Sequence, residues 1–378
     1  MLLKYGAENF FCFKEGAEAS FELSSHCPIA ISRGNKFSNL LCVKGANGSG
    51  KTNILKILPF IGFFCTDSFN NKPDAPIPVF PYFDSEEPIK FYCDFIIGKT
   101  EYYYDLIINN NKVISESISR KRKKTVLLLK REGNKLKENI KEFSKLNDIK
   151  LRSNASIIST ANQYEFEELK HIYIFFSRIY TNVGLLGRFD NKYDNNTSKF
   201  YHDNEKALKF SIEMIKKSDL GINNISIETR KNEKGDEEFF PTFEHDASVN
   251  NNVLTYYAQS SGTKELYNIL PYYRVTLDSG GVLVLDEFDI NLHPHILPLL
   301  IELFDDEKTN PHNAQMIFST HHDSILDYMG KYRTIVVNKE KSESYTFRLD
   351  EIPGDILRND RPIRAIYDAG KVSGVPRV

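Results

Sequence analysis

The sequence contains no tryptophan, and its aromatic residues are 20 tyrosines and 27 phenylalanines. It also lacks a long apolar run. The longest, residues 54–64, includes Lys56 and falls short of the ~20 residues that a transmembrane helix needs. The first residues have no apolar core of the kind that a secretory signal peptide carries. We therefore expect no contact with a membrane and a cytoplasmic location.

Neither sign of charge is in excess, because the formal net charge is −2 at pH 7. Any contact with nucleic acid must therefore come from a local basic patch. The cysteines are few, and none is in C-x-x-C spacing: Cys12, Cys27, Cys42, Cys65 and Cys93. Reduced cysteines in or beside apolar runs are typical of cytosolic proteins. The 378 residues, 41% of them hydrophobic, suffice for two domains or for one large domain with an insertion.

Residues 45–52 fit G-x-x-x-x-G-K-[ST], the phosphate-binding P-loop. The apolar run before them predicts a buried strand, and the run from Asn53 to Phe64 predicts a helix, which is the context that the motif requires. Glycines allow backbone N–H groups to surround a phosphate at the helix N-terminus. Lys51 should reach the β- and γ-phosphates of ATP, and the Thr52 hydroxyl should bind Mg²⁺. The alternative is a glycine-rich loop that binds nothing. The residues expected to hold the nucleotide are Gly45, Asn47, Gly48, Ser49, Gly50, Lys51, Thr52 and Asn53.

Residues 280–287 form a second informative stretch, in which four apolar residues precede Asp286 and Glu287. Such a run predicts a parallel strand buried on both faces, whose C-terminal end lies beside the P-loop. Asp286 should then hold Mg²⁺, and Glu287 should take a proton from the attacking water. The alternative is that both acids cap the next helix. The long separation from Thr52 argues against a small GTPase or nucleoside kinase.

The region after the P-loop begins with strand patterns at residues 91–97, 101–108 and 113–119, which predict a β-meander. A basic run, Arg120–Lys124, follows. Two interpretations of this run stay open. It is either a solvated hairpin edge, because lysine blunts exposed strands, or a contact with nucleic acid or an acidic partner. The charged residues 135–150 are compatible with a helix.

Three later stretches resemble motifs of ABC-type ATPases. Residues 258–266 resemble the signature motif, with Ser260, Ser261 and Gly262 at a predicted helix start. Asp289 stands in a stretch that resembles the D-loop of RecF-, SMC- and OLD-type ATPases. His321 ends a strand as the switch histidine of these families does. The signature has Gln259 and Ser261 in place of a leucine and a glycine, and no Q-loop glutamine is recognised.

A narrower resemblance is to the small AbiL- and RloA-like ATPases of bacterial phage-defence operons. It is carried by Asn9–Phe13, by Ser260–Thr263 and by the ending Tyr367–Pro376. OLD-type relatives carry a Toprim nuclease after the ATPase. The stretch that follows His321, residues 322–378, is shorter than the ~100 residues of such a domain. The resemblance therefore implies an effector, a nuclease or a toxin, on a separate polypeptide.

The resemblance also implies a mechanism, in which two heads meet face to face with ATP and Mg²⁺ between them, as a homodimer or a higher oligomer. Ser260 and Gly262, with Ser261, would contact the γ-phosphate held by the partner. Asp289 would couple the two sites, and His321, or else His322, would sense the γ-phosphate. Two alternatives are a RecF- or SMC-like DNA-repair ATPase, against which stands the absence of a long heptad repeat, and an ATP-dependent scaffold with little turnover.

We therefore predict an α/β fold of the ABC-ATPase type, with a mixed sheet, an antiparallel β-subdomain and a mainly helical insertion. The N-terminal half of the core is placed at residues 1–118, the insertion at 119–255 and the C-terminal half at 256–378. The function expected is ATP hydrolysis that controls a partner in anti-phage defence.

Overall fold

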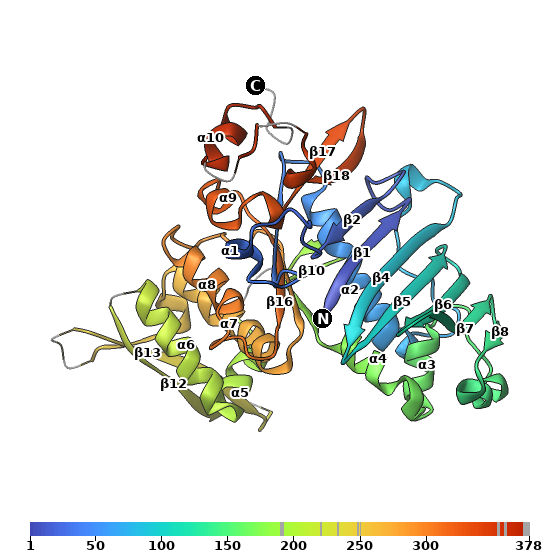
Figure 1. Cartoon of the computed structure of the whole chain (residues 1–378). Helices are drawn as coiled ribbons and strands as arrows, with labels where there is room; N and C mark the ends of the chain where they lie inside the picture. The colour runs from blue at the N-terminus through green and yellow to red at the C-terminus, as the bar shows by residue number, and fades with distance from the viewer. Residues whose placement is uncertain are drawn as a thin grey trace.

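The computed structural model describes residues 1–189, 193–219, 221–232, 234–247, 249, 251–353, 356–358 and 361–372. The Gly374–Pro376 part of the ending singled out above lies outside these residues. Two large sheets and a smaller projecting unit make up the described chain (Figure 1). No helix among the described residues is long and apolar enough to cross a bilayer.

The central sheet has six strands, and all neighbours but one pair are parallel. The apolar runs that precede the P-loop, Asp286 and His321 form its middle, where every residue is buried. In sheet order the strands are β18 (Glu343–Arg348), β17 (Thr334–Glu340), β3 (Leu40–Lys44), β16 (Gln315–Ser319), β15 (Val282–Leu285) and β9 (Ile179–Thr181).

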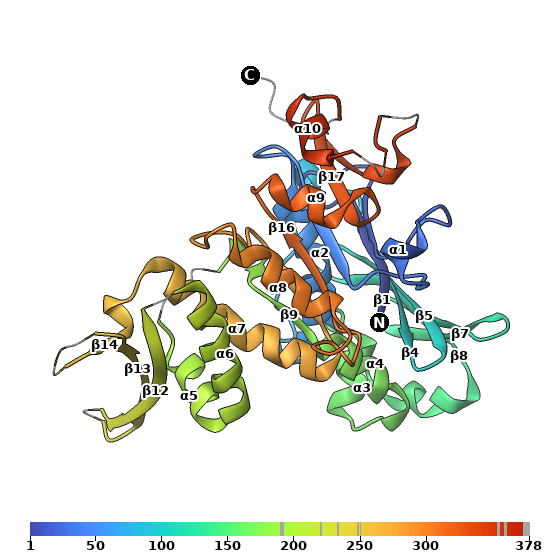
Figure 2. The ribbon, with the colours of Figure 1, turned by 60° about the vertical axis from the view of Figure 1, so that its left-hand side comes forward.

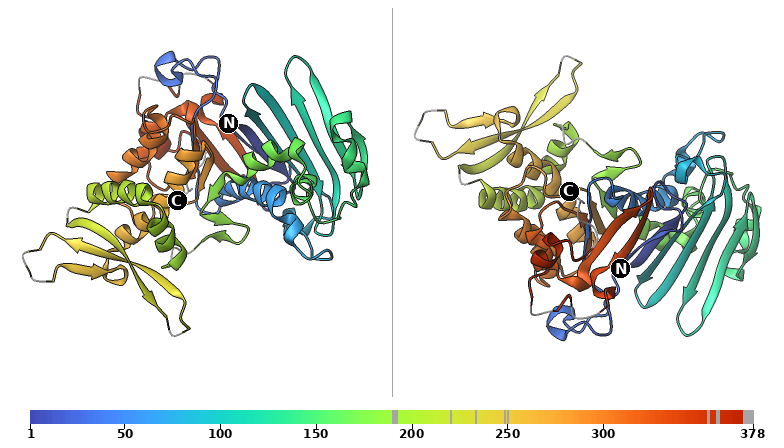
Figure 3. Two further views of the ribbon diagram at one scale, coloured as in Figure 1. Left: turned by 90° about the horizontal axis from the view of Figure 1, so that it is seen from below. Right: turned by 90° about the horizontal axis from the view of Figure 1, so that it is seen from above.

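Helices cover both faces of the central sheet because successive strand residues point to opposite sides. Leu41 and Val43 of β3 pack in one core with α2 (Lys51–Thr66), and Leu40 and Cys42 pack in the other. The second core contains α7 (Ser261–Ser279) and α8 (Ile296–Asp305). Seen from below, α2 lies between the central sheet and the second large sheet (Figure 3).

The second sheet is antiparallel and has seven strands, with α2, α3 (Ile157–Gln163) and α4 (Glu167–Ser177) on its inner side. The predicted meander is confirmed here. The prediction of a helix at residues 135–150 is wrong, because these residues form a strand and then a 3-10 helix, Lys141–Asp148. In sheet order the strands are β2 (Ala17–Ser20), β1 (Leu2–Glu8), β4 (Ile89–Ile97), β5 (Thr100–Ile108), β6 (Val113–Lys121), β7 (Thr125–Glu132) and β8 (Lys135–Asn139).

A buried ion pair joins this sheet to α3. Arg131 Nε lies 3.2 Å from Glu116 Oε2, and neither side chain is exposed. Glu116 also accepts hydrogen bonds from the Ser156 hydroxyl and from the Ile157 N–H. Removing one partner of such a pair would leave a buried charge unpaired, so this contact fixes α3 on the sheet.

The projecting unit consists of α5 (Asn195–Asp203), α6 (Glu205–Ser218) and a sheet of β12 (Ile222–Lys231), β13 (Glu237–His245) and β14 (Val253–Thr255) (Figure 2). The expectation of a mainly helical insertion is therefore wrong. Phe239, Pro241 and Phe243 alternate inward along β13, and this two-residue period specifies a strand. Residues 179–181 even pair with β15 in the central sheet. The division of the chain at residues 118 and 255 stays a prediction.

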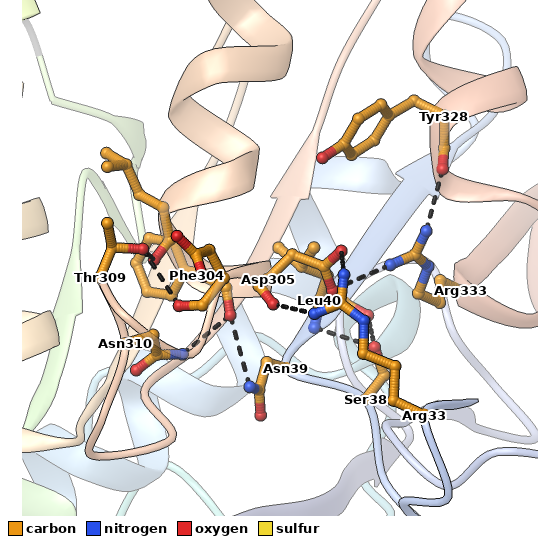
Figure 4. A network of polar contacts seen from close by, with 12 residues as sticks. Arg33, Ser38, Asn39, Leu40, Phe304, Asp305, Thr309, Asn310, Tyr328 and Arg333 are labelled. Carbon is orange, nitrogen blue, oxygen red and sulfur yellow. Dashed lines mark hydrogen bonds and ion pairs between the residues drawn. The ribbon is translucent and has the colours of Figure 1, made fainter. Parts of the chain in front are cut away.

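Short elements complete the described chain: α1 (Ile29–Ser32), β10 (Val183–Gly184), β11 (Gly187–Arg188), α9 (Ser324–Met329) and α10 (Ile363–Asp368). A polar network ties the segment after α1 to the end of α8 (Figure 4). Arg33 Nη2 and Arg333 Nη1 lie 3.1 and 3.3 Å from the two carboxylate oxygens of Asp305. These groups come from three distant parts of the chain, so the network ties the segments that lead into β3 and β17 to the end of α8.

Candidate functional site

The P-loop connects β3 to α2, as predicted, and its backbone conformation needs glycine. Gly45 has φ +154°, and a Cβ atom there would lie 2.3 Å from the Val337 carbonyl oxygen. Gly50, the N-cap of α2, has φ +112°. A β-carbon at either position would force the loop open, so these glycines shape the concave backbone that a phosphate requires.

Lys51 lies inside this loop and is buried. Its Nζ donates to the carbonyl oxygens of Gly45 at 2.9 Å and Ala46 at 3.1 Å. Burial lowers the pKa of Lys51, and the nearby Lys44 lowers it further. The Ser49 hydroxyl oxygen is buried without a hydrogen-bond partner among the described residues. A cation and an unpartnered hydroxyl in one concave loop fit the phosphates of a nucleotide.

Thr52 and Asp286 meet where α2 begins and β15 ends. The Thr52 hydroxyl donates to Asp286 Oδ2 at 2.7 Å, and the Ser319 hydroxyl donates to Asp286 Oδ1 at 2.5 Å. Hydroxyl and carboxylate oxygens are the ligands that Mg²⁺ prefers, and Mg²⁺ usually takes only one or two carboxylates besides phosphates and waters. The pair therefore fits Mg²⁺, although no cluster of three His, Cys, Asp or Glu side chains able to hold a metal is found among the described residues.

Glu287 stands in an unusual backbone conformation directly after Asp286. Its φ is +47°, and its N–H donates to the Ser319 hydroxyl at 2.8 Å. This turn directs the carboxylate away from the buried strand, so its side chain is 40% exposed. His321 Nε2 lies 3.4 Å from Glu287 Oε1. A left-handed non-glycine residue fixed by a hydrogen bond is typical of functional sites.

Asp289 and the two histidines form the rim of this site. Asp289 accepts the His321 N–H at 3.2 and 3.3 Å from its two carboxylate oxygens. His322 Nε2 lies 3.9 Å from Asp289 Oδ2. His321 therefore reaches Glu287 while His322 reaches Asp289, which favours His321 as the histidine next to the reacting groups.

Two residues of this site were missed by the sequence analysis. Asn182, directly after β9, makes two hydrogen bonds with the backbone of Asp286, at 2.7 and 2.9 Å. Ser319, at the end of β16, contacts both acids, as described above. Ser319 was recognisable, because it stands at the C-terminal end of a predicted strand. No signal marked Asn182, since β9 is only three residues long.

The signature residues lie at the N-terminus of α7. The Ser260 hydroxyl caps this helix by accepting the Thr263 N–H at 3.1 Å. A Cβ atom on Gly262 would lie 2.8 Å from the Asn291 carbonyl oxygen, so the D-loop packs against the signature here. No hydrogen bond connects Ser260, Ser261 or Gly262 to the P-loop among the described residues.

The remaining P-loop residues differ in their surroundings. Asn47 and Gly48 are exposed, and the Gly48 carbonyl oxygen accepts a 3.5 Å hydrogen bond from Lys339. Asn53 Nδ2 lies 3.1 Å from Cys12 Sγ, so the Asn53 side chain contacts protein.

Two further histidines, His293 and His295, lie just before α8. Their rings are stacked, with 5.1 Å between the ring centroids.

The basic run Arg120–Lys124 begins with the last two residues of β6 and continues through the turn to β7. Several of its charges have partners. Arg120 lies 3.7 Å from Glu142, and Lys121 lies 3.6 Å from Glu101. Lys123 and Lys124 are exposed, and neither has an ion pair among the described residues. These two lysines are therefore the part of the run most available to a partner.

A family model described as "AAA domain, putative AbiEii toxin, Type IV TA system" matches residues 40–327. A search among curated proteins gave no match. A solved structure of the Smc head bound to the C-winged helix domain of ScpA is 14% identical and covers 92% of this chain and 97% of its own, with TM-score 0.47. An Smc head with an extended coiled coil, bound to the C-terminal domain of ScpA derived from Pyrococcus furiosus, is 11% identical, covers 92% and 96%, and has TM-score 0.42. With the sheet order and P-loop described above, the family match confirms the predicted α/β P-loop ATPase fold.

Proposed function

This chain belongs to the AAA-domain family whose description includes the AbiEii toxin, and on that premise we propose that it binds ATP with Mg²⁺ and hydrolyses ATP at the junction of the P-loop and β15. The observation that carries the proposal is the 2.7 Å hydrogen bond between the Thr52 hydroxyl and Asp286, with Glu287 next in the chain. It supports the proposal because the phosphate loop, the pair that would hold Mg²⁺ and the candidate base meet at this contact.

Each residue then has a defined task. The loop from Gly45 to Lys51 holds the phosphates through backbone N–H groups and the lysine ammonium. Thr52 and Asp286 hold Mg²⁺, which when bound supplies positive charge that stabilises phosphoryl transfer. Glu287 orients the attacking water and takes its proton, and His321, 3.4 Å away, is placed to sense the terminal phosphate. Ser319 and Asn182 keep the two acids in position.

We also propose that ATP drives the chain to form a dimer, or a higher oligomer made of such dimers. Ser260 and Ser261 are exposed at the start of the 19-residue helix α7. A helix N-terminus attracts phosphate, and in the described chain it makes no hydrogen bond to its own P-loop. The partner's bound nucleotide would satisfy Ser260, Ser261 and Gly262. Asp289, which holds the backbone of His321, would couple closure to the state of the site.

The biological role that we propose is control of a separate effector, a nuclease or a toxin, in anti-phage defence in the cytoplasm. The toxin–antitoxin wording of the family description and the motif resemblance to the AbiL- and RloA-like ATPases support it. The test is infection of cells that carry the chain with its neighbouring genes. Protection that is lost with Lys51→Ala and kept with Lys72→Ala supports this role, and equal phage yields in all strains contradict it.

A second candidate is a RecF- or SMC-like role in DNA repair, which the exposed Lys123 and Lys124 favour. Nucleic acid binds proteins mainly through its phosphates. Under this role, double-stranded DNA should stimulate phosphate release, and neutralising both lysines should remove the stimulation. ATPase activity that does not respond to DNA would favour the defence role. A third candidate, a scaffold with little turnover, would show ATP-bound dimers and negligible phosphate release.

The dimer is tested by light scattering with and without ATP. We expect the mass to rise with ATP in the wild type. Ser260→Arg places a bulky cation at the start of α7 and should prevent the rise while leaving ATP binding in the P-loop intact. Lys264→Arg, a charge-conserving change one turn further on, serves as the control. An unchanged mass with ATP in the wild type would contradict the dimer and leave the nucleotide site standing.

A further inference from the structure

Three tyrosines gather on the projecting unit, just before the signature. Tyr193 lies beside Tyr256 and Tyr257, with 5.3 and 5.7 Å between ring centroids. The rings of Tyr256 and Tyr257 are perpendicular, with centroids 5.8 Å apart. We call these three residues the tyrosine cluster. None of them belongs to the P-loop or to the acid pair of β15.

The tyrosine cluster is fixed from several sides. The Tyr256 hydroxyl accepts a hydrogen bond from Asn268 Nδ2 at 2.8 Å, and the Tyr193 hydroxyl donates to the Phe239 carbonyl at 2.5 Å. The Tyr257 carbonyl accepts a 2.9 Å hydrogen bond from Lys264. Tyr257 is nevertheless 73% exposed. Its ring packs against the rings of Tyr193 and Tyr256, and an aromatic ring placed in this way and still open to solvent offers a flat face to a ligand.

A cavity of about 400 Å³ lies against the tyrosine cluster, within the range of roughly 300–1,000 Å³ that small-molecule sites occupy. Phe240 and Pro241 add apolar walls, and Arg230 and Glu238 add charge. Arg230 lies 5.4 Å from the centre of the Phe240 ring and forms a 2.8 Å ion pair with Glu238. Its side chain is 67% exposed, so its guanidinium is open to a ligand at the rim.

These groups distinguish between two kinds of ligand. Aromatic walls bind either an organic cation or a planar heteroaromatic ring. Arg230 already occupies the face of Phe240 that a second cation would use, and Glu238 is already paired with the Arg230 Nε. A planar base that carries a phosphate suits both parts of the cavity, because the base stacks on tyrosine and the phosphate meets the guanidinium. We propose that this cavity binds a nucleoside phosphate by stacking its base on Tyr257.

The ligand has two sources with the same chemistry, a free nucleotide or a unit of single-stranded nucleic acid. Both would stack a base and present a phosphate. The site does not depend on ATP hydrolysis at the P-loop, since none of the residues that line the cavity belongs to the P-loop. It can therefore be tested in a variant that has lost the P-loop lysine.

The absence of tryptophan makes a direct test possible. Tyr257→Trp keeps an aromatic face and introduces the only tryptophan of the chain, whose fluorescence reports stacking. The substitution is made together with Lys51→Ala, so that the P-loop does not bind the probe. Adenosine 5′-monophosphate and a short single strand of deoxyadenylate are titrated separately. Quenching by either probe is expected, and tighter binding of the strand or of the mononucleotide identifies the source.

One control variant and two binding variants define the outcome. Tyr164→Trp places the tryptophan at another exposed tyrosine, 54% exposed and outside the cavity, and should show no quenching. Tyr257→Ala, measured by equilibrium dialysis with the same probes, should weaken binding roughly 5- to 150-fold, the value expected for one stacked base. Arg230→Gln should also weaken binding of the probes and should reduce the salt dependence of this binding. Unchanged fluorescence with both probes, or equal quenching at both tryptophan positions, would overturn the proposal.

Discussion

Thr52 and Asp286 are hydrogen-bonded at 2.7 Å although 234 residues separate them in the chain. Five strands of the second sheet, β4 to β8, lie between them in sequence, as do the projecting unit and α7. The chain returns because β15 and β3 flank β16, and these three parallel strands end at the same edge of the sheet.

Lys51→Ala should abolish measurable ATP binding, because the loop loses the one cation that it directs at the β- and γ-phosphates. Isothermal titration calorimetry measures the affinity. Lys72→Ala, a change of an exposed lysine in a distant loop, is the control and should bind as the wild type does. If Lys51→Ala binds ATP with wild-type affinity, the assignment of the P-loop is wrong.

Ser319→Ala should slow hydrolysis more than it weakens ATP binding. The Ser319 hydroxyl holds Asp286 and the backbone of Glu287, and a hydrogen bond to a charged group is worth about 1.5–3 kcal/mol, or roughly 10- to 150-fold in rate. Phosphate release and ATP affinity are measured on the same preparation. Ser25→Ala, at an exposed serine, should change neither. A wild-type rate in Ser319→Ala would show that the acids keep their positions without it.

Asp94→Asn should stabilise the protein in a pH-dependent way. Desolvation raises the pKa of Asp94 from 3.8 to about 6, and Lys4 only partly opposes it. The folded state therefore binds this proton more tightly than the unfolded state, so the wild type loses stability as the pH rises from about 4 to about 6. The melting temperature of the variant should exceed that of the wild type more at about pH 8 than at about pH 5. An equal difference at both pH values, or a response matched by Asp74→Asn at an exposed site, would refute this.

Replacing Lys123 and Lys124 by glutamine tests the basic turn. If these lysines bind nucleic acid, the double variant should bind DNA more weakly and reduce the slope of log K against log salt by about 0.9 for each phosphate that is no longer neutralised. Fluorescence anisotropy at several salt concentrations gives the slope. Lys216 and Lys217 at the end of α6 provide a matched control pair. An unchanged slope would support the other interpretation, in which the basic run is a solvated hairpin edge.

The central sheet and the acid pair were predictable because their strands are apolar runs that end in recognisable motifs. β8 was not, because it has no buried residue and forms only by pairing with β7, so its local pattern is ambiguous. Asn182 was hidden for a similar reason, since its role comes from the pairing of β9 with β15. The close approach of Gly262 to Asn291 likewise exists only after α7 and the D-loop have packed.

The most direct test of the account is Glu287→Gln, which keeps size and hydrogen bonding and removes the base. Phosphate release should fall by about 10²–10⁴-fold while ATP affinity is preserved. An ATP-bound dimer, or an assembly of such dimers, should accumulate and be detected by light scattering. The double variant that also carries Ser260→Arg should remain monomeric. If the variant loses hydrolysis but its mass does not increase when ATP is added, the dimer is contradicted. Hydrolysis at the wild-type rate in Glu287→Gln would contradict the proposed site chemistry itself.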